Sequence, residues 1–255
     1  MQKSPFSPNM HCSSWPIATL FVCITLTFFE SCAPRKGPTS INEYGLEVVK
    51  WHRVYRWQVD SMGRASAMVP LTNYLSPLRT DVRYATTTNF TGEVLYKRPA
   101  LFLRREAAEA IKLVSDSLKK KQLSLLIYDA YRPYSITQKM WEIVPDDRYA
   151  ANPANGSGHN RGVAVDLTLC NLATGEPLAM PTPYDNFTDT AHHSFTNLPA
   201  IVAANRAQLK GVMEHYGFKA LETEWWHYAL PDPKRYPLLD LSFKQLKKLS
   251  RRHVP

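Results

Sequence analysis

Cysteine is scarce in this sequence, and most of the few cysteines lie near its N-terminal end. Of four in all, Cys12, Cys23 and Cys32 come early, so only Cys170 is left in the rest of the chain. A fold held together by internal disulfide bonds is therefore excluded. Internal repeats and low-complexity tracts are also absent, and 44% hydrophobic with 21% charged residues is typical of a globular domain. We therefore expect the domain to be stabilised by its hydrophobic core, with a bound metal as a second source of stability.

An apolar run with the length of an ordinary membrane span is missing as well. The stretch from Trp15 to Phe29 has instead about the length of the apolar region of a signal peptide, and it follows Lys3 and precedes Cys32. Its end, Phe-Glu-Ser-Cys, resembles a degenerate bacterial lipobox, in which the cysteine is lipidated after cleavage. We therefore expect residues 1–32 to be a signal peptide, and the protein to be exported to the periplasm as a membrane-anchored lipoprotein. A plain secretory signal cut nearby, or an uncleaved anchor, is the alternative.

Positive charge is in excess, with a formal net charge of +9 that is spread along the chain except at the C-terminus. There a basic cluster stands among leucines and comprises Lys244, Lys247, Lys248, Arg251 and Arg252. Such a run is typical of a solvated helix face or a frayed tail, and contact with an envelope surface is the alternative. Nucleic-acid binding would depend on net charge alone, and the signal sequence argues against it, so we expect no nucleic-acid partner.

Hydrophobic patterns divide the chain that follows the signal into three parts. Residues 33–66 form a polar linker or N-terminal extension, residues 67–240 the main domain, and residues 241–255 a basic C-terminal tail. The patterns predict helices over 101–121, from Pro133 to about Trp141 and over 198–216, and strands over Leu123–Asp129, 162–169 and 225–230. This mixture indicates an α+β fold, a single domain with a mainly antiparallel sheet flanked by helices.

Two short stretches carry residue types that bind metals. The stretch SGHNRGVAVD offers His159 and Asp166, and the stretch EWWH offers Glu224 and His227. Zinc takes imidazole and carboxylate ligands, and a catalytic zinc site uses three of them. Positions three apart on a strand point to opposite faces, so Glu224 and His227 converge only at a bend or at the start of the strand. In that case His227 is the third ligand and Glu224 acts on the attacking water as general base. The pattern His-Glu-x-x-His is absent, which excludes the common helical type of metalloprotease.

Each stretch taken by itself has a purely structural interpretation. A histidine beside tryptophan is typical of a packed core, and Asp166 in an apolar strand pairs alternatively with Arg161. Their occurrence together in one chain favours the metal site. A third stretch, DAYRP, puts Arg132 at the end of a strand, where a guanidinium stabilises the oxyanion that forms when water attacks a carbonyl. The alternative for Arg132 is a surface ion pair with Asp129.

At these residues the sequence resembles the zinc D-Ala-D-Ala peptidases related to the vancomycin-resistance enzymes. The pattern Ser-x-His-x-x-Gly-x-Ala-x-Asp followed by Glu-x-x-His is shared with that family. Three stretches are similar to the D-alanyl-D-alanine dipeptidases in particular: RYATTTNFTG from Arg83, YDAYRP from Tyr128 and EWWHY from Glu224. The resemblance covers about Val69 to Tyr236. It departs from the family only at non-ligand positions, with Tyr128 where Trp is frequent and Ala130 where Gly is common.

The resemblance implies a fold of the D-Ala-D-Ala metallopeptidase and hedgehog-like type for the main domain. It implies one Zn²⁺ per chain, bound by His159, Asp166 and His227. It also implies that Glu224 is the general base and acid, and that Arg132 polarises the scissile carbonyl. A His-Asp-His set also holds other divalent ions, so the choice of zinc depends partly on the family.

The resemblance further implies three residues that bind the substrate. Ser157 and Tyr84 fall where the family lines its pocket for the two ends of the dipeptide, and Asp185 falls where the family places a carboxylate near the substrate ammonium. The alternative for Asp185 is an aspartate that caps a turn.

The function that the resemblance implies is hydrolysis of D-Ala-D-Ala, or a related D-amino-acid dipeptide, in the bacterial envelope. An exported enzyme of this kind would serve cell-wall turnover or dipeptide salvage. The alternative enzyme is a peptidoglycan D,D- or L,D-carboxypeptidase with the same zinc site. The alternative of another class is a non-catalytic envelope binding module, against which the presence of His159, Asp166, Glu224 and His227 argues.

Overall fold

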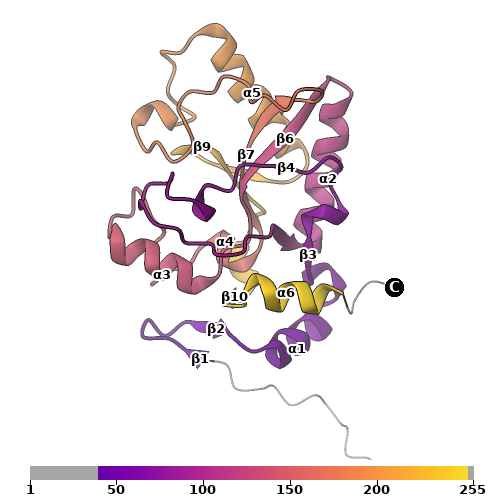
Figure 1. Cartoon of the computed structure of the whole chain (residues 1–255), viewed down its shortest axis with the longest axis vertical. Coiled ribbons are helices and arrows are strands. Elements are labelled where there is room, and N and C mark those ends of the chain that lie inside the picture. Colours follow the sequence, from indigo (N-terminus) through magenta and orange to yellow (C-terminus); the bar gives the residue numbers. More distant parts are fainter. Residues whose placement is uncertain (1–39, 252–255) are drawn as a thin grey trace, which may run out of the picture. The chain divides into compact units, whose positions relative to one another are not determined.

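The computed structural model describes residues 40–251, and its centre is a five-stranded sheet of strand order β4-β6-β7-β9-β8 (Figure 1). The strands are β4 (Arg79–Thr80), β6 (Leu123–Asp129), β7 (Ala164–Asn171), β8 (Lys219–Leu221) and β9 (Glu224–Ala229). β4 pairs in parallel with β6, and the other neighbours are antiparallel. β6 and β7 form because their sequences are rich in branched apolar residues, and β7 is buried almost throughout. The predicted α+β fold with a mainly antiparallel sheet is confirmed.

Two long helices pack on this sheet and on each other. α2 (Arg105–Lys119) lies against β6, and α5 (Ala200–His215) lies against β7, β8 and β9. Of the apolar side chains that recur at helical spacing in α2, Ala110 is partly buried and the others are buried: Ala107, Ile111, Val114 and Leu118. Both helices were predicted, but the first is shorter than 101–121 because residues before it form the strand β5 (Phe102–Arg104), which pairs with β3 (Met68–Pro70).

Short elements fill the long connections of the fold. α3 (Tyr134–Ile143) starts directly after Pro133, as predicted, and α4 (Gly158–Arg161) precedes β7. The short 3-10 helices are η1 (Arg64–Ser66), η2 (Leu71–Asn73), η3 (Arg83–Ala85), η4 (Asp189–Ala191) and η5 (Pro233–Arg235). These connections carry most of the side chains that form the site described below.

In its described part, the segment before the main domain packs on the fold as an N-terminal extension, which is one of the two interpretations, linker or extension, that the sequence allowed for residues 33–66. Within its described part the chain forms β1 (Ser40–Ile41), β2 (Glu47–Val49) and α1 (His52–Met62). β2 pairs in parallel with β10 (Leu238–Leu239), close to the other end of the chain. Val48 and Val49 are buried there, and the Tyr55 hydroxyl of α1 accepts a hydrogen bond of 2.6 Å from the Met68 N–H. The sequence did not reveal this packing because two or three apolar residues make too short a pattern, and the partner strand lies far away along the chain.

The basic C-terminal segment forms the helix α6 (Phe243–Ser250), so in its described part it is a solvated helix face and not a frayed tail. Phe243, Leu246 and Leu249 are buried on its inner side, and the lysines lie on the outer side. Ser242 caps the helix through a capping box with Gln245.

The described residues all belong to one compact unit, Arg35–Pro255. The predicted signal peptide, its lipobox and Cys32 lie outside the described residues. Between residues 40 and 251, no helix combines the length and the apolar character that crossing a bilayer requires.

The structure predicts that the segment before residue 67 contributes to stability. Tyr55→Phe removes the acceptor of the buried Met68 N–H, so we expect it to lower the free energy of unfolding by about 1–3 kcal/mol. The matched control is Tyr44→Phe at a tyrosine of the same segment that is 43% exposed, where we expect a change within about 0.5 kcal/mol. Urea denaturation measures both, and equal, negligible effects would mean that the segment is a linker after all.

Candidate active site and metal centre

A tight turn before β7 presents His159 to the sheet. The Ser157 hydroxyl accepts a hydrogen bond of 3.2 Å from the Asn160 N–H, and Asn160 Oδ1 accepts one of 3.0 Å from the Ser157 N–H, so α4 is capped in both directions. Gly162 ends α4 with φ of 72°, a left-handed conformation that favours glycine. A Cβ on Gly158 would lie 2.9 Å from that of Ala164, so glycine is also required for close packing. The short capped helix therefore holds His159 in one orientation.

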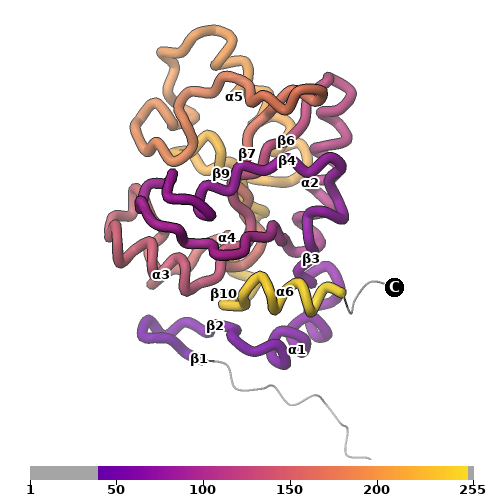
Figure 2. Tube along the Cα trace, viewed as in Figure 1, coloured from indigo at the N-terminus to yellow at the C-terminus, as the bar shows by residue number. Residues whose placement is uncertain are grey.

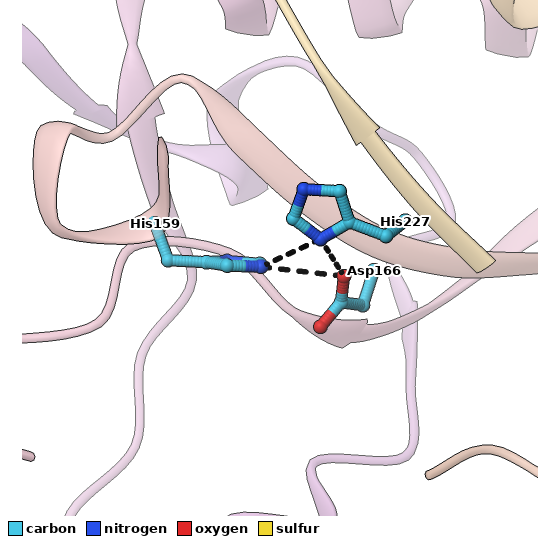
Figure 3. A group of neighbouring side chains, drawn as sticks. All are labelled: His159, Asp166 and His227. Atoms are coloured by element: carbon cyan, nitrogen blue, oxygen red, sulfur yellow. Dashed lines mark hydrogen bonds and ion pairs between the residues drawn. The ribbon is translucent and has the colours of Figure 1, made fainter. Parts of the chain in front are cut away.

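Asp166 and His227 lie opposite each other on adjacent antiparallel strands. The register pairs Asp166 of β7 with His227 of β9, so both side chains leave the same face of the sheet. His227 Nδ1 lies 2.9 Å from Asp166 Oδ1. His159 Nε2 lies 3.2 Å from the same histidine nitrogen and 3.3 Å from the same carboxylate oxygen (Figure 3). The three residues that were predicted to bind metal thus converge, although they come from separate elements.

The chemistry of this cluster suits a divalent cation. His159 Nδ1 lies 2.6 Å from the Ala130 carbonyl oxygen, which can only accept, so Nδ1 carries the proton and Nε2 offers its lone pair to the cluster. One ligand atom from each of His159, Asp166 and His227 lies within 4.8 Å of the others. Burial by itself would raise the pKa of Asp166, but the two imidazoles outweigh it and hold that pKa well below its usual range. Two imidazole nitrogens and a carboxylate oxygen are a ligand set that zinc accepts.

Glu224 reaches this cluster because it is the first residue of β9. The pairing of β8 with β9 is irregular between Ala220 and Leu221, and at this irregularity Glu224 departs from the alternation of the strand. One of its carboxylate oxygens lies 4.0 Å from His227 Nδ1. The structure thus brings Glu224 and His227 together at the start of the strand, the second of the two arrangements that the sequence allowed. Burial raises the pKa of Glu224, His227 opposes this shift, and Asp166 adds to it.

Arg132 is held by a buried ion pair beside the cluster. Its Nε and Nη2 both donate to Asp129 Oδ2, at 3.0 and 2.8 Å, and its Nη2 lies 3.9 Å from Asp166 Oδ2. The expected partner Asp129 is correct, but the pair is buried and not on the surface. Burial would lower the pKa of Arg132, but Asp129 and the surrounding tyrosines raise it well above its usual value, so the guanidinium stays charged. Arg161, the alternative partner of Asp166, instead donates to the Tyr236 carbonyl.

These side chains line a small cavity of about 230 Å³. Its walls include nearly every predicted site residue: Tyr84, Arg132, Ser157, His159, Asp185, Glu224 and His227. Asp166 lies just behind this wall, in contact with both histidines. Tyr149, Phe187 and Leu221 add apolar surface that the sequence analysis did not single out. The volume is below the range of about 300–1,000 Å³ that is usual for drug-sized ligands, so the cavity suits a small substrate.

Asp185 is a buried carboxylate with one oxygen engaged. Its Oδ1 accepts a hydrogen bond of 3.2 Å from the Tyr84 hydroxyl, while its buried Oδ2 has no hydrogen-bond partner among residues 40–251. Burial, and then the charge of Asp166, raises its pKa well above the usual value. The capping oxygen of this turn comes from Asn186, which accepts from the Thr188 N–H at 3.2 Å. Asp185 therefore lines the cavity with one carboxylate oxygen that has no partner in the described chain, instead of capping the turn.

Tyr184 is a site residue that the sequence analysis missed. Its hydroxyl lies 3.0 Å from Asp166 Oδ2 and 3.1 Å from the Tyr84 hydroxyl, so it links Asp166 to the pair formed by Tyr84 and Asp185. The only signal was its place beside Asp185 in the stretch PYDNF. A tyrosine in a proline-rich loop has no feature that separates a site residue from a packed one.

Comparison with known proteins identifies the family of this chain. The sequence profile of the family described as D-ala-D-ala dipeptidase matches residues 64–247. The D-alanyl-D-alanine dipeptidase of Escherichia coli K12 is 33% identical over 178 residues, which are 70% of this chain and 92% of that protein. Proteins of the same name from Enterococcus faecium and Streptomyces coelicolor are 32% and 33% identical, over 63% and 64% of this chain and 89% and 92% of theirs.

Solved structures align more loosely. A vancomycin-resistance D,D-pentapeptidase VanY variant in complex with Zn(II) aligns with a TM-score of 0.35 and 12% identity, over 52% of this chain and 75% of that one. The LD-carboxypeptidase LdcB aligns with a TM-score of 0.34 and 20% identity, over 60% of this chain and 65% of that one. These alignments are too loose to add to the assignment.

The protein is a peptidase of the metallopeptidase class, as the sequence matches and the His-Asp-His cluster together indicate. More particularly, the chain belongs to the D-Ala-D-Ala dipeptidase family, whose profile covers most of its length.

The capped turn predicts a separation of stability from activity. Ser157 and Ser242 both cap a helix through a capping box, so each Ser→Ala change should lower the free energy of unfolding by about 0.5–2 kcal/mol. Only Ser157→Ala should also lower kcat/KM for D-Ala-D-Ala, because α4 carries His159 and α6 carries no residue of the cavity. Thermal unfolding and release of D-Ala measure the two effects. A similar loss of activity in Ser242→Ala would attribute the effect to stability alone.

Proposed function

We propose that this protein is a zinc-dependent dipeptidase that hydrolyses free D-Ala-D-Ala in the bacterial envelope. The observation that carries the proposal is the convergence of His159, Asp166 and His227 at a small cavity. Glu224 lies 4.0 Å from His227, and the charged Arg132 lies 3.9 Å from Asp166. A binding module would have no need for this combination of metal ligands, buried carboxylate and guanidinium.

His159, Asp166 and His227 fit zinc by their number, by the nature of their ligand atoms and by the orientation of His159 through the Ala130 carbonyl. When bound, zinc polarises a carbonyl oxygen and lowers the pKa of water to about 7. The choice of zinc over other divalent metals follows from the family to which the chain belongs.

Glu224 is the residue that moves protons in this proposal. Its carboxylate accepts a proton from the attacking water and then donates it to the amino group of the departing D-Ala, so that the C–N bond breaks and two molecules of D-Ala are formed. Arg132 stabilises the negative charge that develops on the scissile carbonyl oxygen. The buried Asp129 carboxylate orients the Arg132 guanidinium through two hydrogen bonds, so the charge is already in position before the reaction.

Asp185 and Tyr84 provide specificity for a free dipeptide. The unengaged Oδ2 of Asp185 accepts a hydrogen bond from the substrate ammonium, whose charge also keeps this buried carboxylate ionised. Ser157 and Tyr84 contact the ends of the dipeptide. An acylated amino group offers no positive charge to Asp185, and the small cavity leaves little room for a longer stem peptide. These features favour a dipeptidase over a carboxypeptidase that trims peptidoglycan stems.

Export and lipidation at Cys32 are the remaining part of the proposal. The apolar stretch from Trp15 to Phe29 and the Phe-Glu-Ser-Cys sequence support them. An enzyme anchored outside the cytoplasm would act on dipeptide released from the cell wall, so we assign it to wall turnover or dipeptide salvage.

The proposal predicts metal-dependent hydrolysis that requires Glu224. The chain should release D-Ala from D-Ala-D-Ala with zinc, lose this activity with a chelator, and leave L-Ala-L-Ala intact. Glu224→Gln should lower kcat by about 10²–10⁴-fold, because general acid-base catalysis contributes that much. The matched control is Glu222→Gln, an exposed glutamate in the same hairpin, which should keep full activity. Cleavage of muropeptides but not of the dipeptide would favour the carboxypeptidase, and zinc binding without any turnover would favour a binding module.

Asp185→Asn tests recognition of the substrate ammonium. Asparagine tolerates the φ of 60° found at this position, so the backbone should be retained while the charge is lost. We expect kcat/KM for D-Ala-D-Ala to fall by about 10- to 150-fold, the value of a hydrogen bond between charged groups. The unaltered enzyme should strongly prefer D-Ala-D-Ala over its N-acetylated form, and the variant should lose most of that preference. A variant that keeps the full preference would show that Asp185 does not contact the ammonium.

A further inference from the structure

The outer side of α6 belongs to a surface formed only by cations. Arg98, Lys244, Lys247, Lys248 and Arg251 together line a hollow of about 530 Å³, and we call these five residues the basic face. All five are exposed. Tyr96 and Phe243 pack edge to face with ring centroids 5.1 Å apart, and this contact holds the loop that carries Arg98 against the start of α6.

The basic face differs from the charged surfaces of α2 and α5, the two long helices. Lys112 and Lys119 of α2 share Asp116, and Lys210 of α5 pairs with Glu214. In contrast, no residue of the basic face makes an ion pair within the described chain, and α6 contains no acidic residue at all. Cations near the C-terminus of a helix stabilise its dipole, which accounts for Lys247 and Lys248. It does not account for Lys244 in the first turn or for Arg98 on a separate loop.

The chain enters its described fold close to this face. β1, β2 and β10 form one sheet in that order, and α6 follows β10 after three residues, so Ser40 lies two strands away from the start of the basic helix (Figure 2). Residues 33–39 separate Ser40 from Cys32 and span at most about 25 Å when fully extended. A membrane anchor at Cys32 would therefore keep the basic face within reach of the bilayer. This step rests on the proposed export, whereas the basic face itself does not.

Two exposed apolar residues in the N-terminal extension help to decide whether the anionic partner is a lipid surface or a nucleic acid. Trp51 is 59% exposed and Ile41 is 71% exposed. Ile41 lies in β1, which pairs with β2, and Trp51 lies just after β2, the strand that pairs with β10. Tryptophan is typical of membrane interfaces. The basic face has no aromatic side chain on its outer side, although proteins that bind single-stranded nucleic acid stack bases on such side chains. The observations favour a lipid surface.

We propose that the basic face docks on the anionic phospholipid headgroups of the membrane to which the N-terminus is tethered. Lys and Arg side chains near an anionic surface are attracted to its phosphates, and each strengthens binding by about fivefold at physiological ionic strength. Docking would hold the catalytic domain against the bilayer instead of leaving it free on its tether.

The test uses the chain from Arg35 to Pro255, because this compact unit contains every described helix and strand. Cosedimentation is measured with vesicles of phosphatidylglycerol and with vesicles of phosphatidylcholine. We expect binding to the first and not to the second, and loss of binding in about 1 M salt, where charges are screened beyond about 3 Å. No binding to phosphatidylglycerol at low salt would overturn the proposal.

Two matched variants locate the surface. Lys247→Glu with Lys248→Glu should weaken binding to phosphatidylglycerol at least about tenfold. Lys120→Glu with Lys121→Glu changes the net charge equally and should have little effect, because this exposed lysine pair follows α2 and does not line the basic face. Lys247→Gln with Lys248→Gln removes charge with less strain on α6 and should weaken binding several-fold. Equal effects of the two Glu variants would overturn the proposal.

Two further measurements separate this proposal from others. Hydrolysis of D-Ala-D-Ala should be the same in all variants, which would show that the variants are folded. If even the unaltered chain does not hydrolyse the dipeptide, the proposed function fails. Binding to vesicles would still test the basic face, because it does not depend on hydrolysis. A single-stranded oligonucleotide that binds the basic face more tightly than the vesicles do would overturn the lipid assignment in favour of nucleic acid. Competition by inorganic phosphate at millimolar concentration would equally point to a free anion and against the membrane.

Discussion

The antiparallel pairing of β7 with β9 is the constraint on which the site depends. Because its register sets Asp166 directly opposite His227, a carboxylate and an imidazole meet on one face of the sheet without any contribution from loops. A shift by one residue would turn one of them to the opposite face. The strands are buried and rich in apolar residues, so the hydrophobic core that stabilises the sheet also fixes the geometry of the cluster.

Buried polar groups around Asp166 and His227 explain how the charged side chains of the site can be buried without a large loss of stability. The Ala130 carbonyl orients His159, the Tyr184 hydroxyl contacts the second oxygen of Asp166, and Asp129 holds Arg132. Buried charges without such partners would be strongly destabilising. The partners come from β6 and from the loops beside it, where a bulge opposite Asp166 turns the chain into the cavity. The residues that hydrogen-bond to the predicted metal ligands and to Arg132 are therefore as much a part of the site as the ligands themselves.

The two ends of the described chain close the fold on the side of β10. β2 and β10 pair with each other although they are far apart in sequence, and α6 follows directly. The family match begins only at residue 64, so β1, β2 and all of α1 lie before the part that is shared with the dipeptidases. At this end of the domain the N-terminal extension pairs with β10, the strand that leads into α6.

The sequence by itself determined the residue types of the site and most of the large elements. The spacing in SGHNRGVAVD and EWWH, together with the family resemblance, singled out His159, Asp166, Glu224 and His227, because such local patterns are carried by neighbouring residues. Only the tertiary structure decided that Asp166 faces His227, that Tyr184 joins them, and that residues 40–66 belong to the fold. Those features depend on strand register and on contacts between distant segments, and no local pattern in a sequence records which strand will pair with which.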